Sequence, residues 1–291
     1  MNIAESTADQ RNASNPLRPA RAGQVVSRDG TRIAYDQQGS GPPVILIVGA
    51  LCSRALGPGV KLAPLLAHSF TVFTYDRRGR GQSGASRENA PDHVAREIED
   101  LEALITEAGG SVCAFGHSSG AMLALRAAAH GLPIRKLALY EAPLIVDSSR
   151  PSTEQGWRQI EAFVAQGRRG DAVKSFLKLV GVPAFAIALM RWLPVWKQVS
   201  ALAHTLPHDG ALVQEFQKGE QLPAGAWRNV TAPALVIAGG SSPAWMQNGA
   251  RALAAALGNA DVRTLAGQNH DVAPKAIELI LKEFFADSRA G

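Results

Sequence analysis

A five-residue motif with glycine at both ends most constrains how this chain can fold. Residues 116–120 read Gly-His-Ser-Ser-Gly, and they lie between an apolar run at 111–115 and an Ala- and Leu-rich run at 121–130. The first run is typical of a buried parallel strand and the second of a helix. Glycines at both ends permit a turn too tight for side chains, which strains the central serine and projects its hydroxyl above the sheet. Ser118 is therefore a candidate nucleophile.

The same apolar strand pattern recurs on both sides of this motif. Further parallel strands are expected at 44–48, 71–75, 136–140, 234–238 and 262–265. Helical spacing of apolar residues predicts helices over 91–107 and 273–286. Asp29-Gly30, between alternating segments at 24–28 and 31–37, favours an antiparallel hairpin at the edge. The pattern predicts an α/β protein with a mostly parallel sheet flanked by helices.

The loop after the 71–75 strand reads Asp76-Arg-Arg-Gly-Arg-Gly-Gln-Ser83. With the serine turn and the strand order, it resembles the α/β-hydrolase family of the serine-nucleophile type, over residues 24–287. The resemblance implies a core formed by residues 24–143 and 227–291. A helical lid, at 144–226, would be inserted after the sixth strand. Residues 1–23 are polar and are expected to form a flexible N-terminal arm.

A serine hydroxyl needs an adjacent base, and the base needs an orienting acid. His270, after the last expected strand, is the expected base. The family commonly places its acid after the seventh strand, but Ser242 stands there, and no carboxylate occurs between Glu220 and Asp261. A minority of the family takes the acid from the end of the sixth strand, where this chain has Glu141. We therefore predict Glu141 as the acid, with Asp147 as the next candidate.

Attack on a carbonyl would create an oxyanion that needs backbone donors. The N–H of Ser119, directly after the nucleophile, is one expected donor. The loop after the 44–48 strand should supply the other from Ala50, with Leu51 as an alternative. Leu51, His117, Trp192 and Trp196 are the expected substrate-binding side chains. Most aromatic residues of the lid are expected to pack in its own core.

The composition of the chain limits the binding partners, the cofactors and the location that are expected for it. The net charge is +5, but no basic helix face interleaved with aromatics is evident, which argues against nucleic-acid binding. No apolar run approaches the roughly 20 residues of a membrane span, and the N-terminus lacks the apolar region of a signal peptide. Cys52 and Cys113 show no metal-ligand spacing and are expected to be reduced thiols. We expect a cytoplasmic protein with no cofactor and no metal, and a homodimer is left open.

These residues favour a serine hydrolase that cleaves a carboxylic ester or lactone through an acyl-enzyme. The apolar lid favours a substrate with a hydrophobic part. One alternative keeps the fold and triad but cleaves a carbon–carbon bond, with a lid arginine such as Arg191 polarising the substrate. The other alternative is a non-catalytic small-molecule receptor on the same fold.

Overall fold

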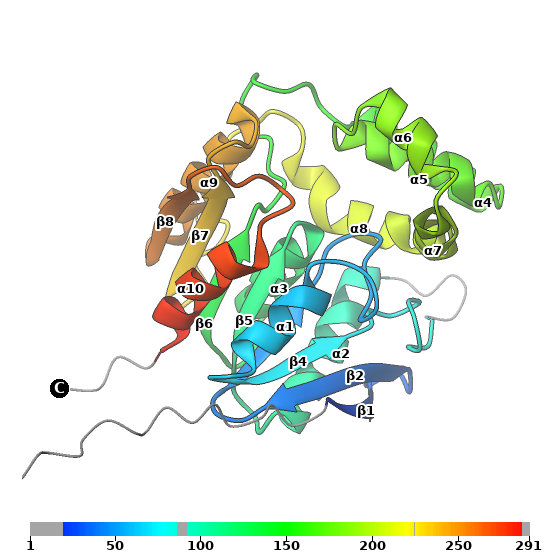
Figure 1. Ribbon diagram of the computed structural model, residues 1–291. Coiled ribbons are helices and arrows are strands. Elements are labelled where there is room, and N and C mark those ends of the chain that lie inside the picture. The colour runs from blue at the N-terminus through cyan, green and yellow to red at the C-terminus, as the bar shows by residue number, and fades with distance from the viewer. Residues whose placement is uncertain (1–19, 86–91, 224, 287–291) are drawn as a thin grey trace, which may run out of the picture.

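The computed structural model describes residues 20–85, 92–223 and 225–286, which form one sheet with helices on both faces (Figure 1). The eight strands follow the order β1-β2-β4-β3-β5-β6-β7-β8. The strands are β1 Arg21–Val26, β2 Arg32–Gly39, β3 Pro43–Ile47, β4 Thr71–Tyr75, β5 Val112–His117, β6 Ile134–Tyr140, β7 Ala234–Gly239 and β8 Ala260–Leu265. Only β2 runs against its neighbours β1 and β4, and the remaining pairs are parallel. This sheet confirms the predicted fold class.

The N-terminal boundary differs from the expectation. Strand β1 begins at Arg21, so residues 21–23 belong to the sheet and not to the predicted arm. Their backbone pairs with residues 35–37 of β2, which accounts for their order without an apolar pattern. The rest of the predicted arm, residues 1–19, lies outside the described residues.

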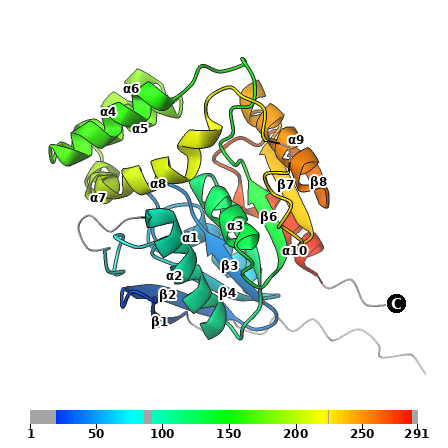
Figure 2. The same ribbon diagram turned by 180° about the vertical axis from the view of Figure 1, so that it is seen from behind.

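Helices between the parallel strands cover the two faces of the sheet. On one face α1 (Gly59–Leu66) packs against α10 (Pro274–Phe285). The other face carries α2 (His93–Glu107), α3 (Ser119–Ala129) and α9 (Ala244–Leu257), as Figure 2 shows from behind. The predicted helices at 91–107 and 273–286 thus appear as α2 and α10.

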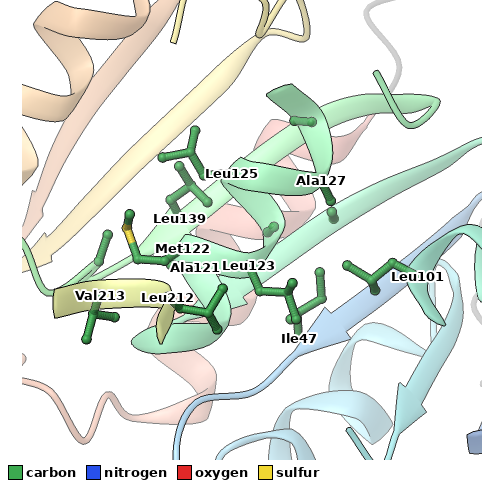
Figure 3. Packing of buried hydrophobic residues seen from close by; sticks show 14 of the residues in the cluster. Ile47, Leu101, Ala121, Met122, Leu123, Leu125, Ala127, Leu139, Leu212 and Val213 are labelled. Atoms are coloured by element: carbon green, nitrogen blue, oxygen red, sulfur yellow. The ribbon is translucent and has the colours of Figure 1, made fainter. Parts of the chain in front are cut away.

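Helix α3, which follows Ser118, is enclosed by the core. Its side chains from Ala121 to Leu125 have no exposed surface. In Figure 3, Leu123 lies between Ile47 of β3 and Leu212 of a helix from the insertion described next. A helix packed on this many sides has little freedom to shift, because protein interiors are close to crystal packing density. The start of α3 is therefore a rigid support for the preceding turn.

The chain between β6 and β7 forms a helical insertion (residues 144–226). Its elements are α4 Glu154–Ala165, α5 Arg169–Leu179, α6 Ala184–Met190, α7 Pro194–Leu202, η1 Ala203–Thr205, α8 Leu206–Val213 and η2 Gln214–Phe216. Helix α8 packs against α2 and α3 and buries Leu206, Leu212 and Val213. Helix α6 lies farther from the sheet and leaves Phe185 78% exposed (Figure 1). The insertion is thus joined to the core mainly through α8.

No helix in the described ranges combines the length and the apolar character needed to cross a lipid bilayer.

Candidate active site

Ser118 occupies a tight turn between β5 and α3. Its φ of 58° and ψ of −128° lie in a region that non-glycine residues rarely adopt. A Cβ on Gly120 would meet the Ile47 carbonyl oxygen at 2.2 Å, so this position must be glycine for the turn to close. Among the described residues, Ser118 Oγ has no hydrogen-bond partner, so the structure records no hydrogen bond between this hydroxyl and His270.

Glu141 and His270 form the polar pair of the site. Glu141 follows β6 and is 1% exposed, and its Oε2 lies 2.8 Å from His270 Nδ1. Because Oε2 of the ionised carboxylate can only accept, Nδ1 carries the proton and donates. Nε2 of His270 is then the free basic nitrogen, which is the tautomer that general-base catalysis needs.

Glu141 is held ionised by two further donors. Its Oε1 accepts the Gly239 N–H at 2.9 Å and the Ser242 hydroxyl. Burial alone would raise the pKa of Glu141, but the hydrogen bonds from His270, Ser242 and Gly239 outweigh it and hold the pKa below its usual value. Ser242, at the position where an aspartate was expected, thus donates to the carboxylate of Glu141. Asp147, the alternative acid, instead accepts from Asn248 at 2.6 Å.

His117 holds the loop that carries His270. The His117 Nε2–H donates to the His270 carbonyl at 3.0 Å, and the Tyr140 hydroxyl donates to the Asn269 carbonyl at 2.5 Å. Burial and the neighbouring His270 lower the pKa of His117 to about 3, so its imidazole is neutral. His117 was predicted as a substrate-binding residue; here it lies 7% exposed beneath the His270 loop.

The loop after β3 passes directly against the nucleophile. A Cβ on Gly49 would lie 2.8 Å from Ser118 Cβ, so only glycine permits this approach. Ala50 follows, and Leu51 is buried with a φ of 55°. The loop after β3 therefore passes beside Ser118, and the second oxyanion donor expected from it stays a prediction.

Backbone strain concentrates at these loops. Among the described residues, four non-glycine residues have positive φ, and three of them are Leu51, Ser118 and Glu141. Such conformations cost roughly 1–3 kcal/mol each and persist at functional sites when the surrounding structure enforces them. The strained residues therefore lie in three loops that carry predicted site residues.

The loop after β4 contributes three buried arginines, two of which share one carboxylate partner. Arg78 binds Asp100 at 2.6 Å and Asp29 at 2.9 Å. Arg77 and Arg80 both bind Asp209 of α8 at 2.7 Å. Burial lowers the pKa of Arg77, but Glu97 and Asp209 outweigh it and hold the pKa above its usual value. The sequence signalled the arginines, but not their partner Asp209, which has no local motif.

The two tryptophans expected at the substrate site lie in the outer part of the insertion. Trp192 is 88% exposed, just beyond α6. Trp196 of α7 is partly buried, and the Arg191 guanidinium lies 5.9 Å from the centre of its ring. Neither has a described contact with Ser118, His270 or Glu141, so their predicted role stays a prediction.

Cys52 lies in the loop after β3. Burial raises the pKa of its thiol to about 11, which disfavours the reactive thiolate. Within the ranges that the structure describes, no group of three or more His, Cys, Asp or Glu could hold a metal ion.

Comparison with known proteins agrees with the fold. The sequence profile of the alpha/beta hydrolase family matches residues 44–279. The crystal structure of an alpha/beta hydrolase from Sphaerobacter thermophilus DSM 20745 is 48% identical, with a TM-score of 0.82 over 90% of this chain and 100% of that one.

Curated relatives match over shorter stretches. N-formylmaleamate deformylase of Pseudomonas putida (strain KT2440) is 31% identical over 160 residues, covering 53% of this chain and 59% of the relative. Probable oxidoreductase EphD of Mycobacterium tuberculosis (strain H37Rv) is 39% identical over 85 residues, covering 28% of this chain and 14% of the relative. The chain therefore spans less than two thirds of these relatives. On the family match, which spans most of its length, the chain belongs to the alpha/beta hydrolase family.

Proposed function

We propose that the protein is a serine hydrolase that cleaves a carboxylic ester or lactone through an acyl-enzyme. The observation that carries this is the 2.8 Å hydrogen bond from His270 to the buried Glu141. The strained Ser118 lies beside this pair, because its backbone N–H donates at 2.9 Å to the carbonyl of Tyr140, the residue directly before Glu141. In this proposal Ser118 is the nucleophile, His270 the general base and Glu141 the orienting acid.

The proposed cycle has two halves. His270 Nε2 takes the proton from Ser118 Oγ as that oxygen attacks the ester carbonyl, and the oxyanion accepts from the N–H groups of Ser119 and Ala50. Collapse breaks the ester C–O bond, and His270 protonates the departing alcohol. A water deprotonated by His270 then attacks the acyl-enzyme, and the free acid leaves as Ser118 regains its proton.

Support for the substrate class comes from several sources. The insertion is rich in aromatic and aliphatic side chains, which suits a hydrophobic acyl or alcohol part. The relative named N-formylmaleamate deformylase suggests adding an N-formyl amide to the substrate panel, because deformylation is also acyl transfer. The lid role of the insertion and the pocket roles of Leu51, Trp192 and Trp196 belong to this proposal.

The test is hydrolysis of a chain-length series of p-nitrophenyl esters, simple lactones and an N-formyl amide. Ser118→Ala should abolish turnover. Glu141→Gln should lower kcat by about 10⁴-fold, because the neutral amide no longer favours the Nδ1–H tautomer of His270. Asp147→Asn, the matched control, should stay within about threefold of wild type, since Asp147 binds Asn248.

Each other result has a meaning. Full activity in Glu141→Gln and loss in Asp147→Asn would overturn the acid assignment. Stoichiometric binding of an ester without turnover would favour the receptor alternative. Cleavage of a carbon–carbon bond in a dienol acid, with no turnover of the ester, lactone and amide panel, would favour the alternative in which Arg191 was the expected polarising group.

A further inference from the structure

We propose that Asp209, on helix α8 of the insertion, is a positioning residue for the oxyanion hole. It would act by fixing both segments that carry the expected donors, the Gly49–Ala50 peptide and Ser119. The inference rests on the proposed function, because an oxyanion hole matters only if a carbonyl is attacked.

Asp209 is fully buried and satisfied by three donors. Its Oδ1 accepts from Arg77 Nη1 at 2.7 Å and from Ser119 Oγ at 2.7 Å, and its Oδ2 accepts from Arg80 Nη2 at 2.7 Å. One carboxylate from the insertion thus contacts the residue that follows the nucleophile. It also joins two arginines of the loop after β4.

The arginines extend this network to the opposite side of the site. Arg80 Nη1 donates to the Gly49 carbonyl at 2.7 Å and to the Cys52 carbonyl at 3.3 Å, while Arg77 Nη1 reaches the Val48 carbonyl at 3.4 Å. Both guanidinium groups are 1% exposed, so little water competes for these carbonyls. The loop after β3 is therefore bound at three carbonyl groups, those of Val48, Gly49 and Cys52.

The Gly49 carbonyl decides where the Ala50 N–H points. In a planar trans peptide the C=O and the following N–H point in opposite directions. Because the Gly49 oxygen is directed at Arg80, the Ala50 N–H is directed away from Arg80, and Gly49 lies against Ser118. Asp209 holds the Arg80 guanidinium in place and so sets this direction from a distance.

The effect of Asp209→Asn on kcat has opposite signs for two possible roles of Asp209. A role through charge predicts a higher kcat, and a role in positioning the donors predicts a lower one. Arg77 and Arg80 are balanced by Glu97 and Asp209, so the cluster is neutral. Asp209→Asn leaves one net positive charge near the hole, which by charge alone would favour an oxyanion and raise kcat. Loss of position would lower kcat, because the donors no longer meet the oxyanion at hydrogen-bond distance.

Asp100 offers a matched control. It is 1% exposed and binds Arg78 at 2.6 and 2.8 Å, so Asp100→Asn also breaks a buried carboxylate–arginine pair. The described arginine partners of the Val48, Gly49 and Cys52 carbonyls are Arg77 and Arg80, whereas Asp100 binds Arg78. The control therefore shares the cost of a broken pair and differs in its connection to the hole.

The experiment measures kcat and KM for the p-nitrophenyl ester that wild type cleaves fastest. A trifluoromethyl ketone of matching chain length supplies an inhibition constant, since its adduct with Ser118 carries an oxyanion. Asp209→Asn should lower kcat about 10- to 100-fold with KM within threefold, and the inhibition constant should rise by a similar factor. Asp100→Asn should change each value less than threefold. Equal behaviour of the two variants, or a higher kcat in Asp209→Asn, would overturn the proposal.

Two additions keep the outcome interpretable. Ser119→Ala removes only the hydroxyl that binds Asp209 and should lower kcat about 3- to 10-fold even if Asp209→Asn does not fold; an unchanged kcat contradicts the proposal.

If wild type and Ser118→Ala are equally inactive, the proposed function fails by itself. Amide hydrogen exchange then decides: residues 48–52 should exchange faster in Asp209→Asn, or in Ser119→Ala if the former does not fold, than in Asp100→Asn.

Discussion

Ser242 stands where the family commonly places its acid, and it contributes a hydrogen bond to the acid in place of a carboxylate. The sequence marked it as the place where an aspartate was expected and found no carboxylate there. In the structure its hydroxyl donates to Glu141 Oε1, so the loop after β7 still serves the acid through a hydrogen bond. A donor to a carboxylate stabilises the ionised form, and such charge-assisted bonds are stronger than neutral ones.

Removing that donor should weaken the acid without removing it. Ser242→Ala leaves the Gly239 N–H and His270 on Glu141, so kcat should fall only about 3- to 10-fold. The measurement is kcat for the p-nitrophenyl ester that wild type cleaves fastest. Ser241→Ala is the control, since Ser241 is exposed. An unchanged kcat in Ser242→Ala would show that this hydrogen bond does not support the acid.

Individual residues also show what the sequence could and could not reveal. Ser118 and Glu141 were predictable because each directly follows a strand whose apolar pattern is local. The role of His117 beneath the His270 loop was missed, because it depends on a contact across 153 residues. Asp209 was missed for the same reason, since its arginine partners lie 129 and 132 residues away.

At the scale of elements, helices α2 and α8 meet through two stacked histidines. His93 of α2 and His208 of α8 have ring centres 4.0 Å apart, near Glu97, Asp209 and Arg77. Burial and the neighbouring His93 lower the pKa of His208 to about 4, whereas an unfolded histidine titrates near 6.5. The imidazole of His208, at the junction between the insertion and the core, therefore stays neutral at a pH at which a histidine of the unfolded chain is protonated.

This junction should lose stability in acid. Between pH 7 and pH 5 the unfolded chain binds a proton at His208 that the folded chain does not, so unfolding becomes easier as pH falls. The contribution of His208 to this loss is about 2 kcal/mol. Urea unfolding at both pH values should show a smaller difference for His208→Asn than for wild type. His68→Asn, at an exposed position, should show the same difference as wild type. An equal difference in unfolding free energy for His208→Asn and wild type would contradict the role given to His208.

The helices of the insertion differ in how much they support the core. Leu212 of α8 is fully buried against α3, while Leu189 of α6 is 64% exposed. Leu212→Ala should therefore lower the free energy of unfolding by about 2–5 kcal/mol. Leu189→Ala should change it by less than about 0.5 kcal/mol. Chemical denaturation checks both, and similar losses would mean that α6 is buried against the core in solution.

The element boundaries were predicted best where the pattern is strong. The parallel strands and helices α2 and α10 appear within two residues of their expected ends in most cases. The division of the insertion into five α-helices was not predicted, because its aromatic residues follow helical spacing only in pieces. Phe185, one of the aromatic residues of an insertion whose aromatics were mostly expected to be packed, is instead strongly exposed. Trp192, expected to bind substrate, is strongly exposed as well.

For the whole molecule, the burial of α8 and the Asp209 network tie the insertion to the sheet. Three of the five tryptophans of the chain, Trp157, Trp192 and Trp196, lie in the insertion, so tryptophan fluorescence is weighted toward it. Far-ultraviolet circular dichroism reports on all helices and strands. We expect both signals to unfold in one transition at neutral pH, because the insertion cannot leave without exposing buried charges. A fluorescence midpoint clearly below the dichroism midpoint would show that the insertion unfolds independently.

The strained backbone at Leu51, Ser118 and Glu141 has a consequence for stability. Each of these residues holds a conformation that glycine would adopt at lower free energy, so together they make the fold less stable than it could be. The stability of the molecule and the geometry of these three loops are therefore opposed: a chain optimised for stability alone would relax them.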